Sequence, residues 1–149
     1  MQNGMLISRL RVEHKRTVRD MAHYLNIGTS PYKRYEANIK PMKIQELNAL
    51  SNYFKVSLNT LLGLSDNLTE YGSYDIDYKY LRFSLRYIRR MNRITQKQLA
   101  KDLKVSIPTV ANFEKHPDTL KADYLRAFAQ RFSVSVDYIC GKTLKKEVL

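Results

Sequence analysis

The feature that most constrains this chain is an internal repeat. Shifted by 78 residues against itself, the sequence matches without a gap from about Leu10 to Gly63. Identical pairs include Arg11 with Arg89, Thr17 with Thr95, Ala22 with Ala100, Leu25 with Leu103, Glu36 with Glu114, Leu47 with Leu125, Ala49 with Ala127, Phe54 with Phe132, Val56 with Val134, Ser57 with Ser135 and Gly63 with Gly141. Other pairs keep their apolar character, as Leu10 does with Ile88. The match predicts two copies of one structural unit.

Charge follows the same division. Residues 1–64 carry a net charge of +6 and residues 80–142 carry +8, whereas the Tyr-rich segment 65–79 carries −3 and residues 143–149 carry +1. We therefore predict two basic domains over 1–64 and 80–142, an acidic linker over 65–79 and a tail over 143–149. The total of +12 indicates a polyanionic partner, which on charge alone could be nucleic acid, an acidic membrane surface or an acidic protein.

Composition excludes several protein classes. No apolar run approaches the roughly 18 residues that span a bilayer, and the opening MQNGMLISRLR lacks the apolar core of a secretory leader. The single cysteine, Cys140, cannot form an internal disulfide and is expected to be a small core residue. We therefore expect a cytoplasmic protein without a membrane segment.

Both copies are predicted to be all-α, with five short helices each. Apolar spacing places the helices at about 5–13, 18–25, 29–36, 42–53 and 58–62 in the first copy, and at about 80–91, 96–103, 107–115, 120–132 and 136–140 in the second. Thr17, Ser57, Thr95 and Ser106 are the predicted N-caps, because their hydroxyls can accept from free N–H groups of the first turn. Gly63 is expected to end the fifth helix.

The first helix of the second copy could begin inside the linker. Ile76, Tyr80, Phe83 and Tyr87 keep helical spacing, whereas the alternation in YDIDY over 74–78 would also suit a short strand. We favour the helix. Tyr and Phe at such spacing are expected in the core, because base stacking is a property of single-strand binders.

The ordered set of residues resembles the Cro and phage-repressor type of helix-turn-helix family, also called XRE. In the second copy it is carried by Thr95, Gln96, Leu99, Ala100, Leu103, Val105, Ser106, Val110, Phe113, Glu114, Phe132, Val134, Ser135 and Asp137. In the first copy it is carried by Leu10, Arg11, Met21, Ala22, Leu25, Ile27, Tyr35, Glu36, Asn38, Pro41 and residues 54–57. The resemblance implies two tandem five-helix, lambda-repressor-like domains.

In this family the third helix enters the major groove, where all four base pairs differ in their donors and acceptors. By resemblance, Thr29, Ser30 and Arg34 contact bases in the first copy. The matching residues of the second copy are Ile107, Pro108 and Asn112. Asn112 could recognise adenine, whereas its two companions could only touch a thymine methyl group.

Phosphate contacts are expected around these helices. The family places a Gln at the start of its second helix to hold a phosphate; Gln96 has that position in the second copy, whereas Val18 in the first cannot form a hydrogen bond. The expected phosphate contacts are Arg16, Arg19, Lys33, Lys40, Lys43, Gln96, Lys97 and Lys121. Each copy departs from the family at a different point, so one of them could have acquired a protein-contact role.

Several charged residues have structural interpretations. By resemblance, Arg11 with Glu36 and Arg89 with Glu114 form salt bridges between the first and third helices. The cationic run of Arg86, Arg89, Arg90 and Arg93 is either a solvated helix face or a surface for phosphate or an acidic partner. His14, His23 and His116 have no Cys or carboxylate at ligand spacing, so no metal is expected.

These features lead to one main hypothesis. The chain acts as a covalent pseudo-dimer on double-stranded DNA, with two half-sites about 34 Å apart and a flexible linker whose span is about 20 Å. The resemblance implies a transcriptional repressor of bacterial, phage or mobile-element origin. A homo-oligomer is also possible, but the sequence does not identify its surface.

Two other functions stay open. The first is an accessory DNA-binding protein of plasmid transfer, replication or recombination. The second is an adaptor whose degenerate helix-turn-helix domains bind an acidic protein. The sequence contains no catalytic triad, phosphate-binding Gly-rich loop or HExxH motif, so we expect neither an enzyme nor a cofactor.

Overall fold

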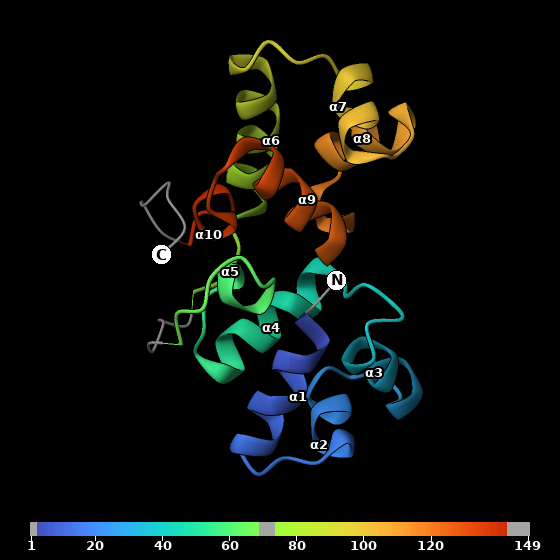
Figure 1. Cartoon of the computed structure of the whole chain (residues 1–149), viewed down its shortest axis with the longest axis vertical. Helices are drawn as coiled ribbons and strands as arrows, with labels where there is room; N and C mark the ends of the chain where they lie inside the picture. The colour runs from blue at the N-terminus through green and yellow to red at the C-terminus, as the bar shows by residue number, and fades with distance from the viewer. Residues whose placement is uncertain (1–2, 69–73, 143–149) are drawn as a thin grey trace.

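The computed structural model describes residues 3–68 and 74–142, and the chain is all-α within these ranges, as predicted (Figure 1). The α-helices are α1 (Asn3–Glu13), α2 (Val18–Tyr24), α3 (Thr29–Glu36), α4 (Ile44–Phe54), α5 (Leu58–Leu61), α6 (Tyr78–Met91), α7 (Gln96–Leu103), α8 (Ile107–Lys115), α9 (Ala122–Phe132) and α10 (Val136–Ile139). A short 3₁₀ helix, η1 (Pro117–Thr119), precedes α9. The second to fifth helices of the N-terminal half (α1–α5) begin 78 residues before their counterparts in the C-terminal half (α6–α10). The prediction of helix at the end of the linker is confirmed, because α6 begins at Tyr78.

Local chemistry sets the ends of these helices. The hydroxyls of Thr17 and Thr95 each accept a hydrogen bond from the backbone N–H of the third residue of their helix. The side chain of that third residue accepts from the backbone N–H of the threonine in return, so both ends form capping boxes. The hydroxyls of Ser57 and Ser106 likewise accept from the backbone N–H of the third residue of α5 and α8. Gly63 follows α5 with φ +73°, a left-handed conformation that glycine adopts without strain. The predicted N-caps are therefore confirmed. They explain why the observed helices begin close to the residues predicted from the sequence.

The packing of α1 against the end of α3 depends on one glycine. The backbone N–H of Gly4 donates to Oδ1 of Asn38 at 2.9 Å. A Cβ at this position would lie 2.5 Å from the carbonyl oxygen of Glu36 and 2.6 Å from that of Tyr35. The absence of a side chain therefore allows the two helices to approach, and Asn38 supports the contact from a left-handed backbone with φ +58°.

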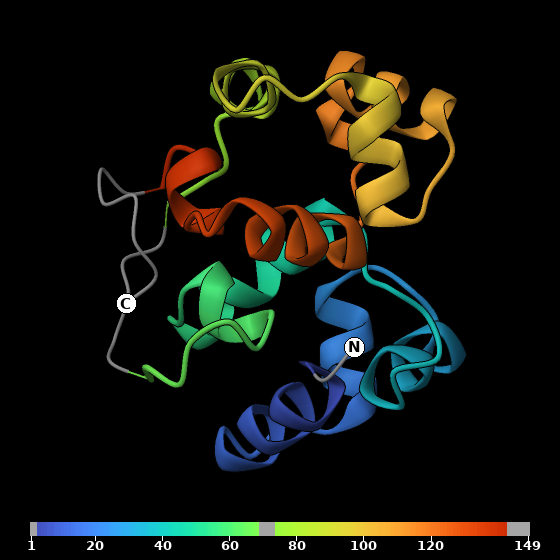
Figure 2. The same cartoon turned by 45° about the horizontal axis from the view of Figure 1, so that its top comes forward.

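The two halves pack directly on each other. The loops that follow α3 and η1 form an antiparallel bridge: the N–H of Ile44 donates to the carbonyl of Leu120 at 2.9 Å, and that of Ala122 donates to the carbonyl of Met42 at 2.8 Å. Buried residues from both halves form one continuous cluster. Figures 1 and 2 show α4 and α9 at the centre of the molecule, with α1–α3 on one side and α6–α8 on the other.

The expectation of a flexible tether between the halves is therefore wrong. The described C-terminal end of the linker is itself anchored, because Asp75 accepts hydrogen bonds from the amides of Asn48 and Asn52, and the N–H of Asp77 donates to the carbonyl of Cys140. Residues 69–73 of the predicted linker and the predicted tail, 143–149, lie outside the described residues. Cys140 is fully buried, as expected for a core residue.

One part of the core prediction is wrong. Phe83 and Tyr87, which the spacing placed in the core, are 61% and 49% exposed. The inward face of α6 is formed instead by Leu81, Ser84 and Leu85. Both sets follow helical spacing, and the larger aromatic side chains lie on the outer face.

Candidate nucleic-acid interface

In each half, a short turn sets the angle between the second and third helices. In the N-terminal half, Asn26 follows α2 with φ +56°, and α3 starts three residues later, at Thr29, after its N-cap Gly28. Met21 and Ala22 on α2 are buried, as are Tyr32 and Tyr35 on α3. The inner faces of the two helices therefore form the core, which leaves the opposite face of α3 for solvent.

The predicted base-contacting residues of the first half lie on that solvent face. Thr29, Ser30 and Arg34 are all exposed, as is Lys33, a predicted phosphate contact on the same helix. The predicted phosphate contacts Arg16, Arg19, Lys40 and Lys43 are exposed as well, and the guanidinium of Arg16 lies 6.0 Å from the centre of the Tyr53 ring. The N-terminal half thus presents cationic and hydroxyl side chains to solvent, and the carboxylate of Asp20 is close enough to Arg16 and Arg19 to interact with them electrostatically.

The third helix of the C-terminal half presents a different surface. Ile107, Pro108 and Asn112 are exposed, with Ile107 at 44%. The amide nitrogen of Asn112 donates to the hydroxyl of Thr119 in η1 at 3.3 Å, a contact that the sequence did not indicate. Lys97 and Lys121 are exposed. This half offers fewer hydrogen-bonding groups along α8 than the first offers along α3.

An equivalent ion pair joins the first and third helices of each half. Arg11 donates to Glu36, with Nε 2.8 Å from Oε2, and its Nη1 reaches the carbonyl of Arg16. Arg89 makes the equivalent contacts, with Nε 2.6 Å from Oε2 of Glu114. Each arginine therefore joins the first helix to the third and also holds the loop before the second.

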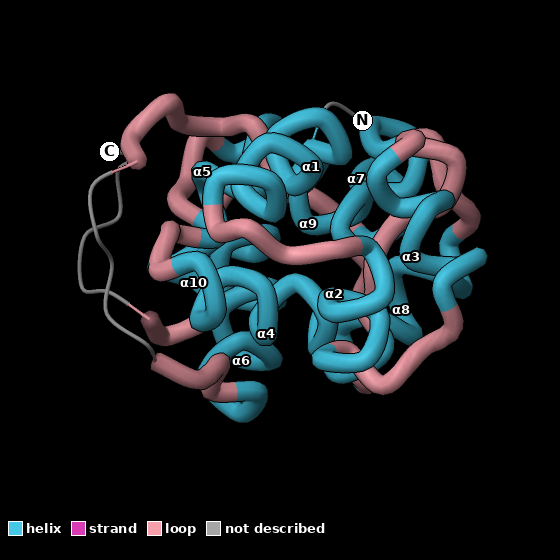
Figure 3. The backbone as a smooth tube through the Cα atoms, turned by 90° about the horizontal axis from the view of Figure 1, so that it is seen from below, coloured by secondary structure: helices cyan, strands magenta, loops and turns pink. Residues whose placement is uncertain are grey.

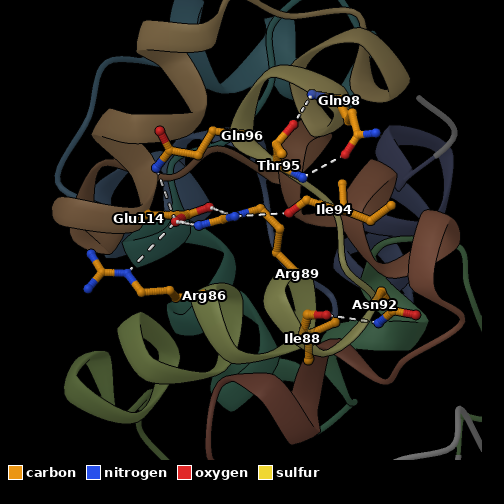
Figure 4. Close-up of polar contacts among 9 residues, drawn as sticks. All are labelled: Arg86, Ile88, Arg89, Asn92, Ile94, Thr95, Gln96, Gln98 and Glu114. Atoms are coloured by element: carbon orange, nitrogen blue, oxygen red, sulfur yellow. Dashed lines mark hydrogen bonds and ion pairs between the residues drawn. The ribbon is translucent and has the colours of Figure 1, made fainter.

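The C-terminal ion pair is part of a larger cluster. Figure 4 shows Glu114 at its centre, accepting from Arg89 and from the amide of Gln96 at 3.3 Å, with Arg86 at 3.8 Å. The side chain of Glu114 is 2% exposed, compared with 13% for Glu36. Gln96, the expected phosphate contact, is therefore directed toward this carboxylate in the structure.

Reciprocal contacts also join the fifth helices of the two halves. The carboxylate of Asp137 accepts from the N–H groups of Leu58 and Asn59 at 2.9 Å each. In return, the side chain of Asn59 accepts from the N–H of Val136 at 2.7 Å and donates to the hydroxyl of Ser135 at 2.8 Å. Asn59 and Asp137 are 78 residues apart, so equivalent positions contact each other, which is the pattern of a two-fold interface.

A buried lysine completes this interface. Lys142 is 5% exposed and donates from Nζ to the hydroxyl of Ser51 at 2.9 Å and to Oδ1 of Asn48 at 3.3 Å. Burial lowers the pKa of Lys142, and the nearby carboxylate of Asp137 partly opposes this effect. Burial raises the pKa of Asp137, against the two backbone N–H groups that stabilise its charged form. These contacts were not predicted from the sequence, although Asp137 is one of the residues that carry the family resemblance.

The arrangement of the halves brings the two third helices to one side. In Figures 1 and 3, α3 and α8 lie toward the same side of the molecule, and α5 and α10 lie toward the opposite side. The bridge that includes Lys43 and Lys121 joins the segments that follow α3 and α8. These two exposed lysines therefore lie where the two halves meet, between α3 and α8 on one side and α4 and α9 on the other in chain order, which the sequence did not predict.

Two features, a metal-binding cluster and a membrane-spanning helix, are absent from the described part of the chain. There, no three His, Cys, Asp or Glu side chains gather in a way that could hold a metal ion. The helices described in residues 3–68 and 74–142 are too short or too polar for any of them to cross a bilayer.

Comparison with known proteins agrees with this geometry. The helix-turn-helix family model matches residues 85–139, and these residues form a helix-turn-helix domain of the XRE type. A protein of Bacillus subtilis (strain 168) named as the uncharacterized HTH-type transcriptional regulator YobD is 34% identical over 61 residues, which are 41% of this chain. The matched region covers 54% of that relative, so the chain spans about half its length. No solved structure matches the chain.

Proposed function

We propose that the helix-turn-helix domain over residues 85–139 is one of two in this chain, and that together they bind double-stranded DNA as a transcriptional regulator. The proposed domains are 1–64 and 80–142, joined by a linker over 65–79. The observation that carries the proposal is that equivalent positions of the two halves pack reciprocally on each other. The backbone hydrogen bonds donated by Ile44 and by its counterpart Ala122 are one example. Such packing supports a pseudo-dimer built from a single chain.

The packing of the two halves supports one way for the proposed domains to approach a duplex. Because α3 and α8 lie toward the same side, they can enter successive major grooves, which are about 34 Å apart on one face of B-DNA. A flexible tether would tolerate variable spacing, whereas packed halves require one spacing and one relative orientation. We therefore expect half-sites in inverted orientation with a fixed separation.

The two half-sites should differ in sequence. In the first domain, we assign base contacts to Thr29, Ser30 and Arg34; an Arg placed bidentately on guanine contributes about 1–3 kcal/mol of discrimination. In the second domain, Asn112 is suited to adenine and Ile107 to a thymine methyl group. Pro108 adds only an apolar contact, so the C-terminal half-site should be less sharply defined.

Phosphate contacts should supply most of the affinity. We assign them to exposed cations around the two units: Arg16, Arg19, Lys33, Lys40, Lys43, Lys97 and Lys121. Lys43 and Lys121 lie where the two halves meet, so they are suited to the backbone between the half-sites. Gln96 can join them only if it turns from Glu114, to which it donates at 3.3 Å.

Selection of bound duplexes from a random library tests the proposal. We expect an asymmetric inverted motif with one fixed spacing, and Arg34→Ala should erase preference at one position of the better-defined half-site while Asn112→Ala affects the other. Log affinity should fall with log salt, with a slope of about −0.9 for each phosphate contacted. A selected pool without sequence preference, or with variable spacing, would contradict the proposal.

Repression is the regulatory mode that we propose. A protein that covers two successive grooves can block polymerase where its site overlaps a promoter. A reporter placed behind the selected site should lose expression when the chain is supplied, and Arg34→Ala should restore it. Binding sites located away from promoters, at transfer or replication origins, would instead favour an accessory DNA-binding role.

A further inference from the structure

We propose that the outer face of α6 is a docking surface for an acidic amphipathic helix of a partner protein. The face centres on three apolar side chains at four-residue intervals, Phe83, Tyr87 and Met91, which are 61%, 49% and 64% exposed. The rings of Phe83 and Tyr87 stack with centroids 5.3 Å apart and planes inclined by 20°. They form a continuous apolar ridge along the helix surface.

Cations border this ridge. A groove of about 540 Å³ along α6 is lined by the three apolar side chains together with Lys79, Arg82, Arg86 and Arg90, and no carboxylate is among its lining residues. Lys79, Arg82 and Arg90 are exposed, and Arg86 is half-buried near Glu114. The surface therefore offers apolar area and positive charge along the same helix.

The fold itself does not require this combination. The counterparts of Phe83, Tyr87 and Met91 on α1, 78 residues earlier, are Met5, Arg9 and Glu13. The cations Arg82, Arg86 and Arg90 correspond to Gly4, Ser8 and Val12. Since α1 takes the equivalent place in the N-terminal half without the ridge or its border, the α6 surface is specific to the C-terminal half.

Other occupants fit this surface less well. Two of the described linker acids are held elsewhere, because Asp75 accepts from α4 and Asp77 caps α6 through Oδ1. A second copy of a chain with a net charge of +12 would bring identical cations together. Duplex DNA would satisfy the cations but would leave the apolar ridge in water, and α6 lies on the side of α10 rather than that of α8 in Figures 1 and 3.

The shape of the ridge favours a helix over a single-stranded nucleic acid. Rows of side chains at four-residue intervals pack into the grooves of a facing helix. Stacked bases would need separate ring faces, whereas Phe83 and Tyr87 cover each other and Met91 has no ring. The distance from Lys79 to Met91 along α6 is about 18 Å, so the partner helix needs about three turns, with apolar residues on one face and Asp or Glu beside them.

A fluorescein-labelled 18-residue peptide with Leu on one helical face and Glu beside it is a suitable probe, with binding to the full chain followed by fluorescence anisotropy. Two controls are a scrambled peptide of the same composition and an oligothymidine. We expect the amphipathic peptide to bind at least tenfold more tightly than the scrambled one. The double variant Phe83→Ser with Tyr87→Ser should lose at least tenfold in peptide affinity while keeping its affinity for the selected duplex.

The matched control is Met5→Ser with Val12→Ser, which removes exposed apolar side chains from α1 instead; it should bind the peptide like the unsubstituted chain. Circular dichroism should show the same helix content in all variants. Equal binding of the scrambled peptide, or no loss in the α6 variant, would overturn the proposal. So would preferential binding of oligothymidine, or self-association in sedimentation that disappears in the α6 variant. Because the duplex assay is separate, failure here leaves the proposed DNA binding intact.

Discussion

Replacing Asp137 by Ala should destabilise the contact between the two halves. Its carboxylate is 1% exposed and accepts two hydrogen bonds from backbone N–H groups of the other half, those of Leu58 and Asn59. These donors belong to the first turn of α5, whose N–H groups have no partner within the helix. Alanine leaves both donors buried without an acceptor.

The magnitude follows from those two donors. A buried donor left without a partner costs about 1–3 kcal/mol. The desolvation of the carboxylate, which raises the pKa of Asp137, offsets part of the benefit of the contact. We therefore expect the free energy of unfolding to fall by about 2–4 kcal/mol, a large part of the roughly 5–15 kcal/mol typical of domains.

Urea unfolding followed by far-UV circular dichroism measures this loss, and hydrogen exchange at the amides of Leu58 and Asn59 should accelerate in the same variant. The matched control is Asp123→Ala, because Asp123 is exposed in the first turn of α9 and accepts only from the next residue's N–H. Its loss should stay below about 1 kcal/mol. If Asp137→Ala costs no more than this control, or exchange is unchanged, the reasoning about the interface is refuted.

Three further outcomes are expected. Gly4→Ala should lower stability by about 1–3 kcal/mol in thermal unfolding, because its Cβ would lie 2.5 Å from a carbonyl oxygen at the end of α3; an unchanged midpoint would contradict that contact. Arg89→Ala should cost about 3–5 kcal/mol in urea unfolding, and Arg11→Ala less, because Glu114 is more deeply buried than the partner of Arg11; equal losses would argue against burial as the cause. The pKa of Lys142 in the folded protein lies below its ordinary value of 10.5, so the folded protein loses this proton at a lower pH than the unfolded chain does. Between the lowered pKa and 10.5, the buried amine becomes neutral in the folded protein, so its charge no longer opposes folding. Over that pH range, the free energy of unfolding measured with urea should rise relative to that of the Lys142→Met variant. A difference between the two proteins that does not change with pH would argue against a lowered pKa.

Sequence predicted the helices well because the signals that set them are local. Thr17, Thr95, Ser57 and Ser106 each cap the helix that directly follows them, so a few neighbouring residues decide each start. The all-α class followed from the same information. The short η1 was missed because its Pro-Asp-Thr sequence has no periodicity to detect.

The contacts between the halves could not be predicted in this way. Asn59 and Asp137 have equivalent places in the repeat but are different residue types, and they are joined only in the folded chain. Phe83 and Tyr87 were misplaced because two helical rows of α6 are apolar, and spacing alone does not say which one faces inward. All the predicted DNA-contacting side chains except that of Gln96 are exposed, and the selection experiment tests their roles.

The bridge and the reciprocal hydrogen bonds between the halves also affect how occupancy of the proposed DNA site depends on protein concentration. Two separate subunits must first find each other, so their occupancy of a paired site falls steeply when the protein is scarce. Here the companion unit is always present on the same polypeptide, already held by the bonds around Asp137. Under the proposed function, occupancy of the DNA site should therefore vary hyperbolically with protein concentration, and a mutation in one half should retune one arm of the proposed target while leaving the other arm unchanged.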